Sequence, residues 1–133
     1  MGSSGSYLKS GGFTHQEWEQ VGSIKGVKVL KKNGTKEGIK GGLPLYSNTP
    51  GTAYILLDAD GKFSQFRQYS EDRKMKFDID YGRHNSSYEY LHIHYYDKNG
   101  HKKKTEAIAL PNNVIINKNL YEKYKGFLKG INL

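Results

Sequence analysis

The stretches KMKFDIDY (Lys74–Tyr81) and EYLHIHYY (Glu89–Tyr96) decide the fold. In each stretch one set of alternate residues is apolar and the other carries charged, imidazole or phenol groups, which is typical of a strand with one buried face. Burial of the apolar set sends the polar set to the other face of the sheet: Lys76, Asp78, Asp80, His92 and His94. If the two strands pair through the loop at 82–87, these groups lie roughly 5 to 8 Å apart. We therefore expect an ionisable cluster on a solvent-facing sheet surface.

Further strands are predicted on both sides of this pair. Residues 54–57 form a continuous apolar run, the turn at 58–61 follows, and 62–69 returns along it. Asn99-Gly100 favours a tight hairpin that leads into a strand at 101–110. Residues 27–30 indicate only a short strand or loop.

Helices are predicted at both ends of the chain. Thr14 and Glu17 have capping-box spacing, and Trp18 with Val21 would give a helix of about two turns its apolar contact. A second helix is expected after Asn117 or Asn119, where apolar residues recur at helical spacing: Leu120, Tyr124, Phe127, Leu128 and Ile131. The predicted fold is α+β: a short N-terminal helix, a central twisted antiparallel sheet of about four to five strands, and a C-terminal helix.

The chain has 133 residues and no cysteine, which excludes disulfides, thiol catalysis and cysteine-type zinc sites. Residues 1–12 read as a disordered tag and linker, and we expect 13–133 to form a single domain. No run approaches about 18 apolar residues and no signal peptide is evident, so we expect no contact with a membrane.

A net charge of +8 favours a polyanionic partner, with nucleic acid as the first candidate. A basic surface that only maintains solubility, or an acidic protein partner, stays open as an alternative.

The predicted cluster suits cleavage of RNA without a metal. One histidine can take the proton of a 2′-hydroxyl while another donates to the leaving 5′-oxygen, and Lys or Arg can stabilise the phosphate charge. Asp78 or Asp80 could orient an imidazole. Two alternatives remain: a plain polar face, or a metal site, because His-x-His with a nearby Asp is also metal-ligand chemistry.

The ordered motifs Arg67-Gln68-Tyr69, Asp78-Ile79-Asp80-Tyr81, His84 and His92-Ile93-His94 resemble a known family. They are similar to toxin modules of bacterial polymorphic toxins and to related domains on phage head proteins, assigned to the barnase, EndoU, colicin and RelE-like group of ribonucleases. The resemblance covers about 54–100. Leu91 stands where many toxin modules have proline, as in the phage-type versions.

This resemblance implies RNA cleavage, often of tRNA, without metal or small-molecule cofactor. It also implies neutralisation by a dedicated immunity protein, which we expect to be acidic. The implied catalytic residues are Arg67, Asp78, Asp80, His84, His92 and His94. Lys76, Arg73, Arg83, Tyr69 and Tyr90 are predicted to bind substrate.

The resulting hypothesis is a metal-independent endoribonuclease that leaves a 2′,3′-cyclic phosphate. It would be exported by or delivered from a bacterium or phage and act in the cytoplasm of a target cell. His84 and one of His92 or His94 would be base and acid, with Arg67 and Lys76 on the phosphate. The alternatives are a metal-dependent nuclease at the same cluster and a noncatalytic nucleic-acid-binding or virion module.

Overall fold

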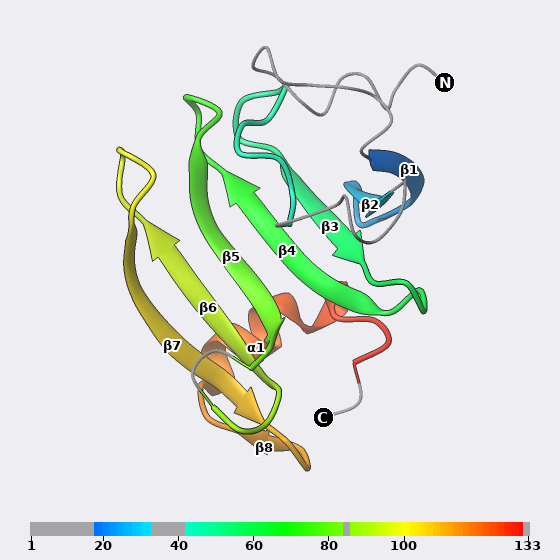
Figure 1. The fold of residues 1–133 in the computed structure, drawn as a ribbon, viewed down its shortest axis with the longest axis vertical. Helices are drawn as coiled ribbons and strands as arrows, with labels where there is room; N and C mark the ends of the chain where they lie inside the picture. The colour runs from blue at the N-terminus through cyan, green and yellow to red at the C-terminus, as the bar shows by residue number, and fades with distance from the viewer. Residues whose placement is uncertain (1–17, 33–41, 84–85, 132–133) are drawn as a thin grey trace.

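The computed structural model describes residues 18–32, 42–83 and 86–131. These residues form one twisted sheet of eight strands whose spatial order follows the chain (Figure 1). The strands are β1 (Trp18–Ile24), β2 (Val27–Lys32), β3 (Ala53–Leu57), β4 (Phe63–Tyr69), β5 (Met75–Gly82), β6 (Tyr90–Tyr96), β7 (Lys102–Leu110) and β8 (Val114–Ile115).

Neighbouring strands are antiparallel with one exception, the parallel pair β2 and β3. The hairpins predicted at 58–61 and 97–100 are both present, and each is held by an aspartate. Oδ1 of Asp58 accepts from the backbone N–H groups of Asp60 and Lys62, and Oδ1 of Asp97 accepts from those of Asn99 and His101. A short side chain that satisfies turn amides in this way explains why these sequences reverse direction.

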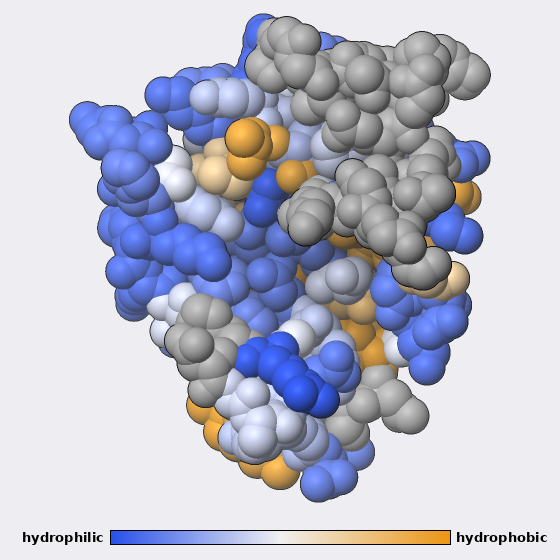
Figure 2. Space-filling model, in the orientation of Figure 1, coloured by the Kyte–Doolittle hydropathy of each residue, from blue (hydrophilic) through white to orange (hydrophobic). Residues whose placement is uncertain are grey.

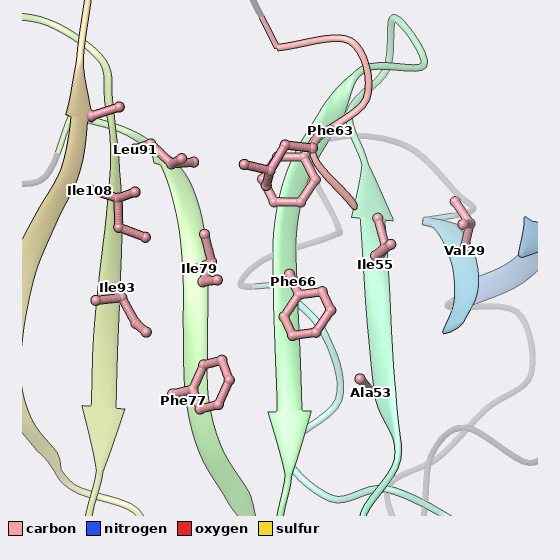
Figure 3. Close-up of a cluster of buried hydrophobic side chains, with 12 residues drawn as sticks. Val29, Ala53, Ile55, Phe63, Phe66, Phe77, Ile79, Leu91, Ile93 and Ile108 are labelled. Atoms are coloured by element: carbon pink, nitrogen blue, oxygen red, sulfur yellow. The ribbon is translucent and has the colours of Figure 1, made fainter. Parts of the chain in front are cut away.

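The main core lies on the face of the sheet that the helix covers. Helix α1 (Lys118–Tyr124) begins after Asn117, whose side chain accepts from the N–H of Leu120, and continues as the 3-10 turn η2 (Lys125–Phe127). Both lie behind the sheet in Figure 1. Aromatic rings join the two layers, with Tyr124 and Phe127 centred 5.5 Å and 5.2 Å from the ring of Phe66. Figure 3 shows the buried side chains that the strands direct toward this layer.

A second, smaller core lies on the opposite face, at the β1–β4 end of the sheet. Its buried members are Trp18, Leu30, Leu43, Tyr54, Leu56 and Tyr69. Because both faces of β3 are covered, its sequence is continuously apolar instead of alternating. The β4–β6 part of this same face carries the polar cluster.

The predicted fold class is wrong. The described residues contain an eight-stranded mixed sheet and one short helical segment, not four to five antiparallel strands between two helices. Trp18 and Val21, expected on an N-terminal helix, lie in β1. Lys25 and Gly26 both have positive φ, 50° and 83°, and this tight turn folds β1 back onto β2. The predicted tag at 1–12 and the capping pair Thr14 and Glu17 lie outside the described residues.

Candidate active site

The register of β5 and β6 builds the centre of the site. Asp80 pairs with His92 and Asp78 with His94, while Ile79 pairs with Ile93. Cross-strand partners point to the same side of a sheet, so the isoleucines enter the main core and the ionisable side chains gather on the other face. The predicted pairing of these strands and their division into two faces are confirmed.

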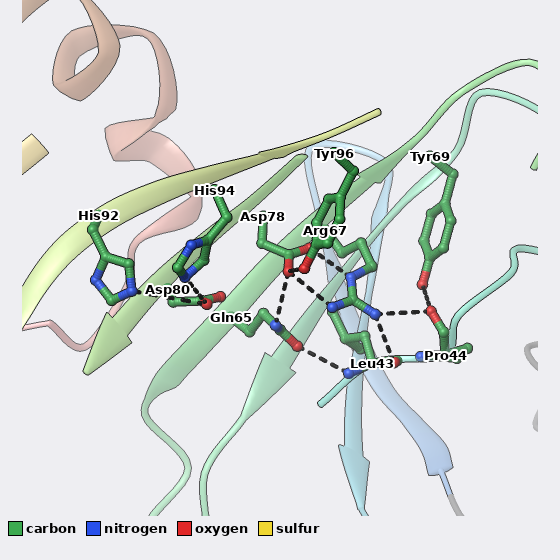
Figure 4. Close-up of polar contacts among 10 residues, drawn as sticks. All are labelled: Leu43, Pro44, Gln65, Arg67, Tyr69, Asp78, Asp80, His92, His94 and Tyr96. Carbon is green, nitrogen blue, oxygen red and sulfur yellow. Dashed lines mark hydrogen bonds and ion pairs between the residues drawn. The ribbon is translucent and has the colours of Figure 1, made fainter. Parts of the chain in front are cut away.

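Asp80 faces both imidazoles (Figure 4). Its Oδ2 lies 3.2 Å from Nε2 of His94 and 4.0 Å from Nε2 of His92. Its Oδ1 is buried and has no hydrogen-bond partner among the described residues. Of the two predicted orienting carboxylates, the structure therefore places Asp80 at the histidines.

The other ring nitrogens of the histidines are held by neighbours in the sheet. Nδ1 of His92 lies 3.2 Å from the backbone oxygen of Tyr90, and Nδ1 of His94 lies 2.7 Å from Oγ1 of Thr105. A carbonyl oxygen only accepts, so Nδ1 of His92 carries the proton, and Nε2 of the neutral ring is a proton acceptor. The hydroxyl of Thr105 can donate or accept, so His94 can keep a proton on Nε2 facing Asp80.

The expectation that the two histidines face solvent is wrong. Each is 3% exposed, because its ring packs edge-on against the other at a centroid distance of 4.7 Å. The ring of Tyr90 also packs beside that of His92, with 4.8 Å between the ring centroids. Gly42 and Leu56, from elements outside β5 and β6, line the same hollow and complete its wall. Strand alternation predicts which face a side chain takes, but not whether another part of the chain covers that face.

Arg67 and Asp78 form a buried ion pair beside the histidines. Arg67 donates from Nε to Oδ1 of Asp78 at 2.5 Å and from Nη2 to Oδ2 at 2.8 Å, and its Nη1 donates to the backbone oxygens of Leu43 and Pro44. Burial opposes the charge on Arg67, but the hydrogen bonds and charge of Asp78 outweigh it and raise the pKa of the guanidinium. These contacts commit Arg67 to a structural role and argue against the predicted contact with phosphate.

Sequence reasoning missed two partners of this pair, Tyr96 and Gln65. The hydroxyl of Tyr96 donates to Oδ2 of Asp78 at 2.5 Å, and burial, followed by the charge of Asp78, raises the pKa of that hydroxyl. Gln65 bridges the network to the N–H of Leu43 through its Oε1. Tyr96 lies two residues after His94 in β6, and Gln65 lies two residues before Arg67 in β4. Because alternate residues of a strand point to the same face, the sequence could have identified both as neighbours of the predicted site.

A cleft of about 380 Å³ opens beside the histidines. Asp80, His92 and His94 line it together with Gln65, Gly82 and Arg83. Arg83 is exposed, so its positive charge stands at the rim. Figure 2 shows this face as predominantly hydrophilic over β4–β7, in contrast to the apolar face under α1.

The other predicted substrate-binding residues are dispersed. Tyr69 is 1% exposed and donates to the backbone oxygen of Pro44, which makes it part of the second core. Lys76 is exposed beside a different hollow, with Gln68 and Glu71, and Arg73 lies in the exposed β4–β5 turn. The structure does not bring Lys76 or Arg73 to the histidines. His84 lies outside the described residues.

Comparisons with protein-family models, curated proteins and solved structures found no match for this chain. Among the described residues, no helix is long and apolar enough to cross a membrane.

Proposed function

We propose that this chain is a metal-independent endoribonuclease whose active site is the cleft at Asp80, His92 and His94. One observation carries the proposal: both histidines turn Nε2 toward one carboxylate at the cleft, while their Nδ1 atoms are held by Tyr90 and Thr105. Such an arrangement fixes two imidazoles in the orientation that general acid–base catalysis requires. The charge of +8 supports a nucleic-acid substrate, and the RNA 2′-hydroxyl supplies a nucleophile already joined to the substrate.

The hydrogen bonds suggest a division of roles. His92, whose Nδ1–H is directed to a backbone oxygen, accepts the 2′-hydroxyl proton at Nε2 as the 2′-oxygen attacks phosphorus. His94, protonated at Nε2 and paired with Asp80, donates that proton to the departing 5′-oxygen as the P–O5′ bond breaks. The products are a 2′,3′-cyclic phosphate and a free 5′-hydroxyl. Both proton transfers are then made by side chains of β6.

Among the described residues, Arg83 is the cation best placed to meet the phosphate. It lines the same cleft as both histidines and is exposed, whereas Arg67 is occupied by Asp78 and two backbone oxygens. A guanidinium can form two parallel hydrogen bonds to phosphate oxygens and stabilise the charge that builds there. We therefore assign to Arg83 the phosphate-stabilising role that the sequence suggested for Arg67.

The test is incubation of purified protein with total RNA in excess EDTA, followed by end-group analysis. Wild type should produce fragments that carry cyclic phosphate, and His92→Gln or His94→Gln should slow cleavage by about 10²- to 10⁴-fold. Because both rings are buried, thermal unfolding of each variant must accompany the assay. His101→Gln is the matched control, since the side chain of His101 is 79% exposed in the β6–β7 hairpin. RNA that stays intact with folded wild-type protein would contradict the proposal.

A metal-dependent nuclease is a second candidate, favoured by a separate observation. One possible ligand atom from each of Asp80, His92 and His94 lies within 4.8 Å of the other two. Two imidazoles and a carboxylate suit zinc, manganese or iron, and the bonds at Nδ1 resemble those that orient metal-ligating histidines. Cleavage that is lost in EDTA and restored by Zn²⁺ or Mn²⁺ would favour this candidate over the metal-independent one.

A further inference from the structure

A row of aromatic rings leads along β6 to the two histidines. Tyr88, which is 46% exposed, lies 6.1 Å from Tyr90 between ring centroids, and Tyr90 lies 4.8 Å from His92. Tyr90 is partly exposed and His92 is buried. The row therefore runs from the surface to the reacting groups of the proposed active site.

Beside this row the sheet has a position without a side chain. Gly82 is the cross-strand partner of Tyr90, so a side chain at 82 would stand next to the tyrosine ring on the same face. A Cβ added at Gly82 meets nothing within 4 Å, and its φ is not positive, so neither crowding nor backbone conformation requires glycine there. Gly82 also lines the cleft with Arg83, His92 and His94. The glycine therefore leaves space at the edge of the cleft that a side chain at 82 would fill, and we call this space the slot.

We propose that this slot receives one unpaired nucleobase of a single-stranded RNA, stacked on Tyr90. The inference rests on the proposed function in placing the phosphate next to that base at His92 and His94. Every nucleobase has a flat face that stacks on an aromatic ring, and Arg83 at the same cleft can hold the adjoining phosphate. In a duplex both faces of a base are covered by its neighbours, so the slot selects single strands. The sugar–phosphate chain also suits the charge of +8.

The test measures binding, separately from cleavage. The probe is a short fluorescent 2′-O-methyl RNA, which lacks the nucleophilic hydroxyl, used as a single strand and as a duplex at one fixed low salt concentration. Gly82→Val places a β-branched side chain in the slot, in a strand where valine is well tolerated. Gly22→Val is the matched control, because Gly22 is also a strand residue without positive φ and a Cβ there also meets nothing within 4 Å.

Wild type and Gly22→Val should bind the single strand equally and the duplex more weakly. Gly82→Val should weaken single-strand binding by about 5- to 100-fold, the range expected for loss of one stacked base. Tyr90→Phe should retain binding and Tyr90→Leu should lose it to a similar extent. Unchanged binding by Gly82→Val, or equal affinity for the duplex, would overturn the inference.

The proposed nuclease activity and the proposed base-binding slot can each be contradicted without the other. Binding that depends on Gly82 and Tyr90, together with intact unmodified RNA in every metal condition, would support the slot and overturn the nuclease. Cleavage by wild type with unchanged binding by Gly82→Val would support the nuclease and overturn the slot.

Discussion

Asp80 and His94 meet diagonally across β5 and β6. Although the register pairs Asp80 with His92, its Oδ2 lies nearer to Nε2 of His94, at 3.2 Å against 4.0 Å. The carboxylate of Asp80 therefore lies closer to His94 than to His92, although both histidines belong to β6. At 3.2 Å, Oδ2 of Asp80 can accept a hydrogen bond from an N–H at Nε2 of His94.

Asp80→Asn tests this relationship. The amide is similar in size but carries no charge, so the proton on His94 loses its electrostatic partner, and we expect cleavage to slow by about 10²-fold or more while the fold persists. The measurement is the single-turnover rate on an RNA substrate as a function of pH. Asp60→Asn, in the exposed β3–β4 turn, is the control. A wild-type rate for Asp80→Asn would exclude the carboxylate from the mechanism.

The ion pair of Arg67 and Asp78 gives a stability prediction. Arg67→Met leaves a buried carboxylate without its cation and should lower the free energy of unfolding by about 3 to 5 kcal/mol. The double change Arg67→Met with Asp78→Leu should restore part of this loss, because no unpaired charge remains buried. Urea denaturation measures both, with the exposed Lys76→Met as control. If the double variant is less stable than Arg67→Met, the loss does not come from the unpaired carboxylate.

The central strands were predictable because their signals are local. Alternation at Lys74–Tyr81 and Glu89–Tyr96, with turn residues before and after, predicts both β5 and β6 and the face that each side chain takes. The same parity brings Asp80, His92 and His94 together without any knowledge of the rest of the chain.

The N-terminal half was not predictable in the same way. β2 and β3 pair in parallel across a long connection, and no local pattern signals such contacts. The polar face is partly covered by Leu43 and Pro44, whose backbone oxygens accept hydrogen bonds from Arg67. These two residues are far from Arg67 in sequence, so this contact has no local signal either. The turn at Lys25-Gly26 was a usable signal for the β1–β2 hairpin. The helical interpretation of Trp18 and Val21 was wrong because their segment pairs with β2 as a strand.

A substitution of His84 distinguishes the mechanism predicted from the sequence, in which His84 is an acid or base, from the proposed mechanism, in which His92 and His94 make both proton transfers. If His92 and His94 carry both proton transfers, His84→Ala should keep at least about a tenth of the wild-type cleavage rate, well short of the loss expected for an essential acid or base. The assay is the same single-turnover measurement in EDTA. A loss of about 100-fold or more would return one proton transfer to His84, as the family resemblance implies.

Alkaline pH should unfold the protein through its buried tyrosines. The hydroxyls of Tyr69 and Tyr96 donate to Pro44 and Asp78, and burial in the first place raises the pKa of both. In the unfolded chain a tyrosine loses its proton near pH 10, whereas these two keep theirs to higher pH in the folded state. Above about pH 10 the unfolded state therefore binds fewer protons than the folded state, and stability falls as pH rises. Below that pH the two groups add no pH dependence.

Urea denaturation between about pH 8 and pH 11 measures this slope. Tyr96→Phe should be less stable at neutral pH, because Asp78 loses a hydrogen bond, but its stability should fall less steeply above about pH 10. Tyr46→Phe, which removes an exposed hydroxyl, is the control for the ionisation of surface groups. If Tyr96→Phe loses stability with the same slope as wild type, the hydroxyl of Tyr96 ionises equally in both states, and its bond to Asp78 does not hold the proton in solution.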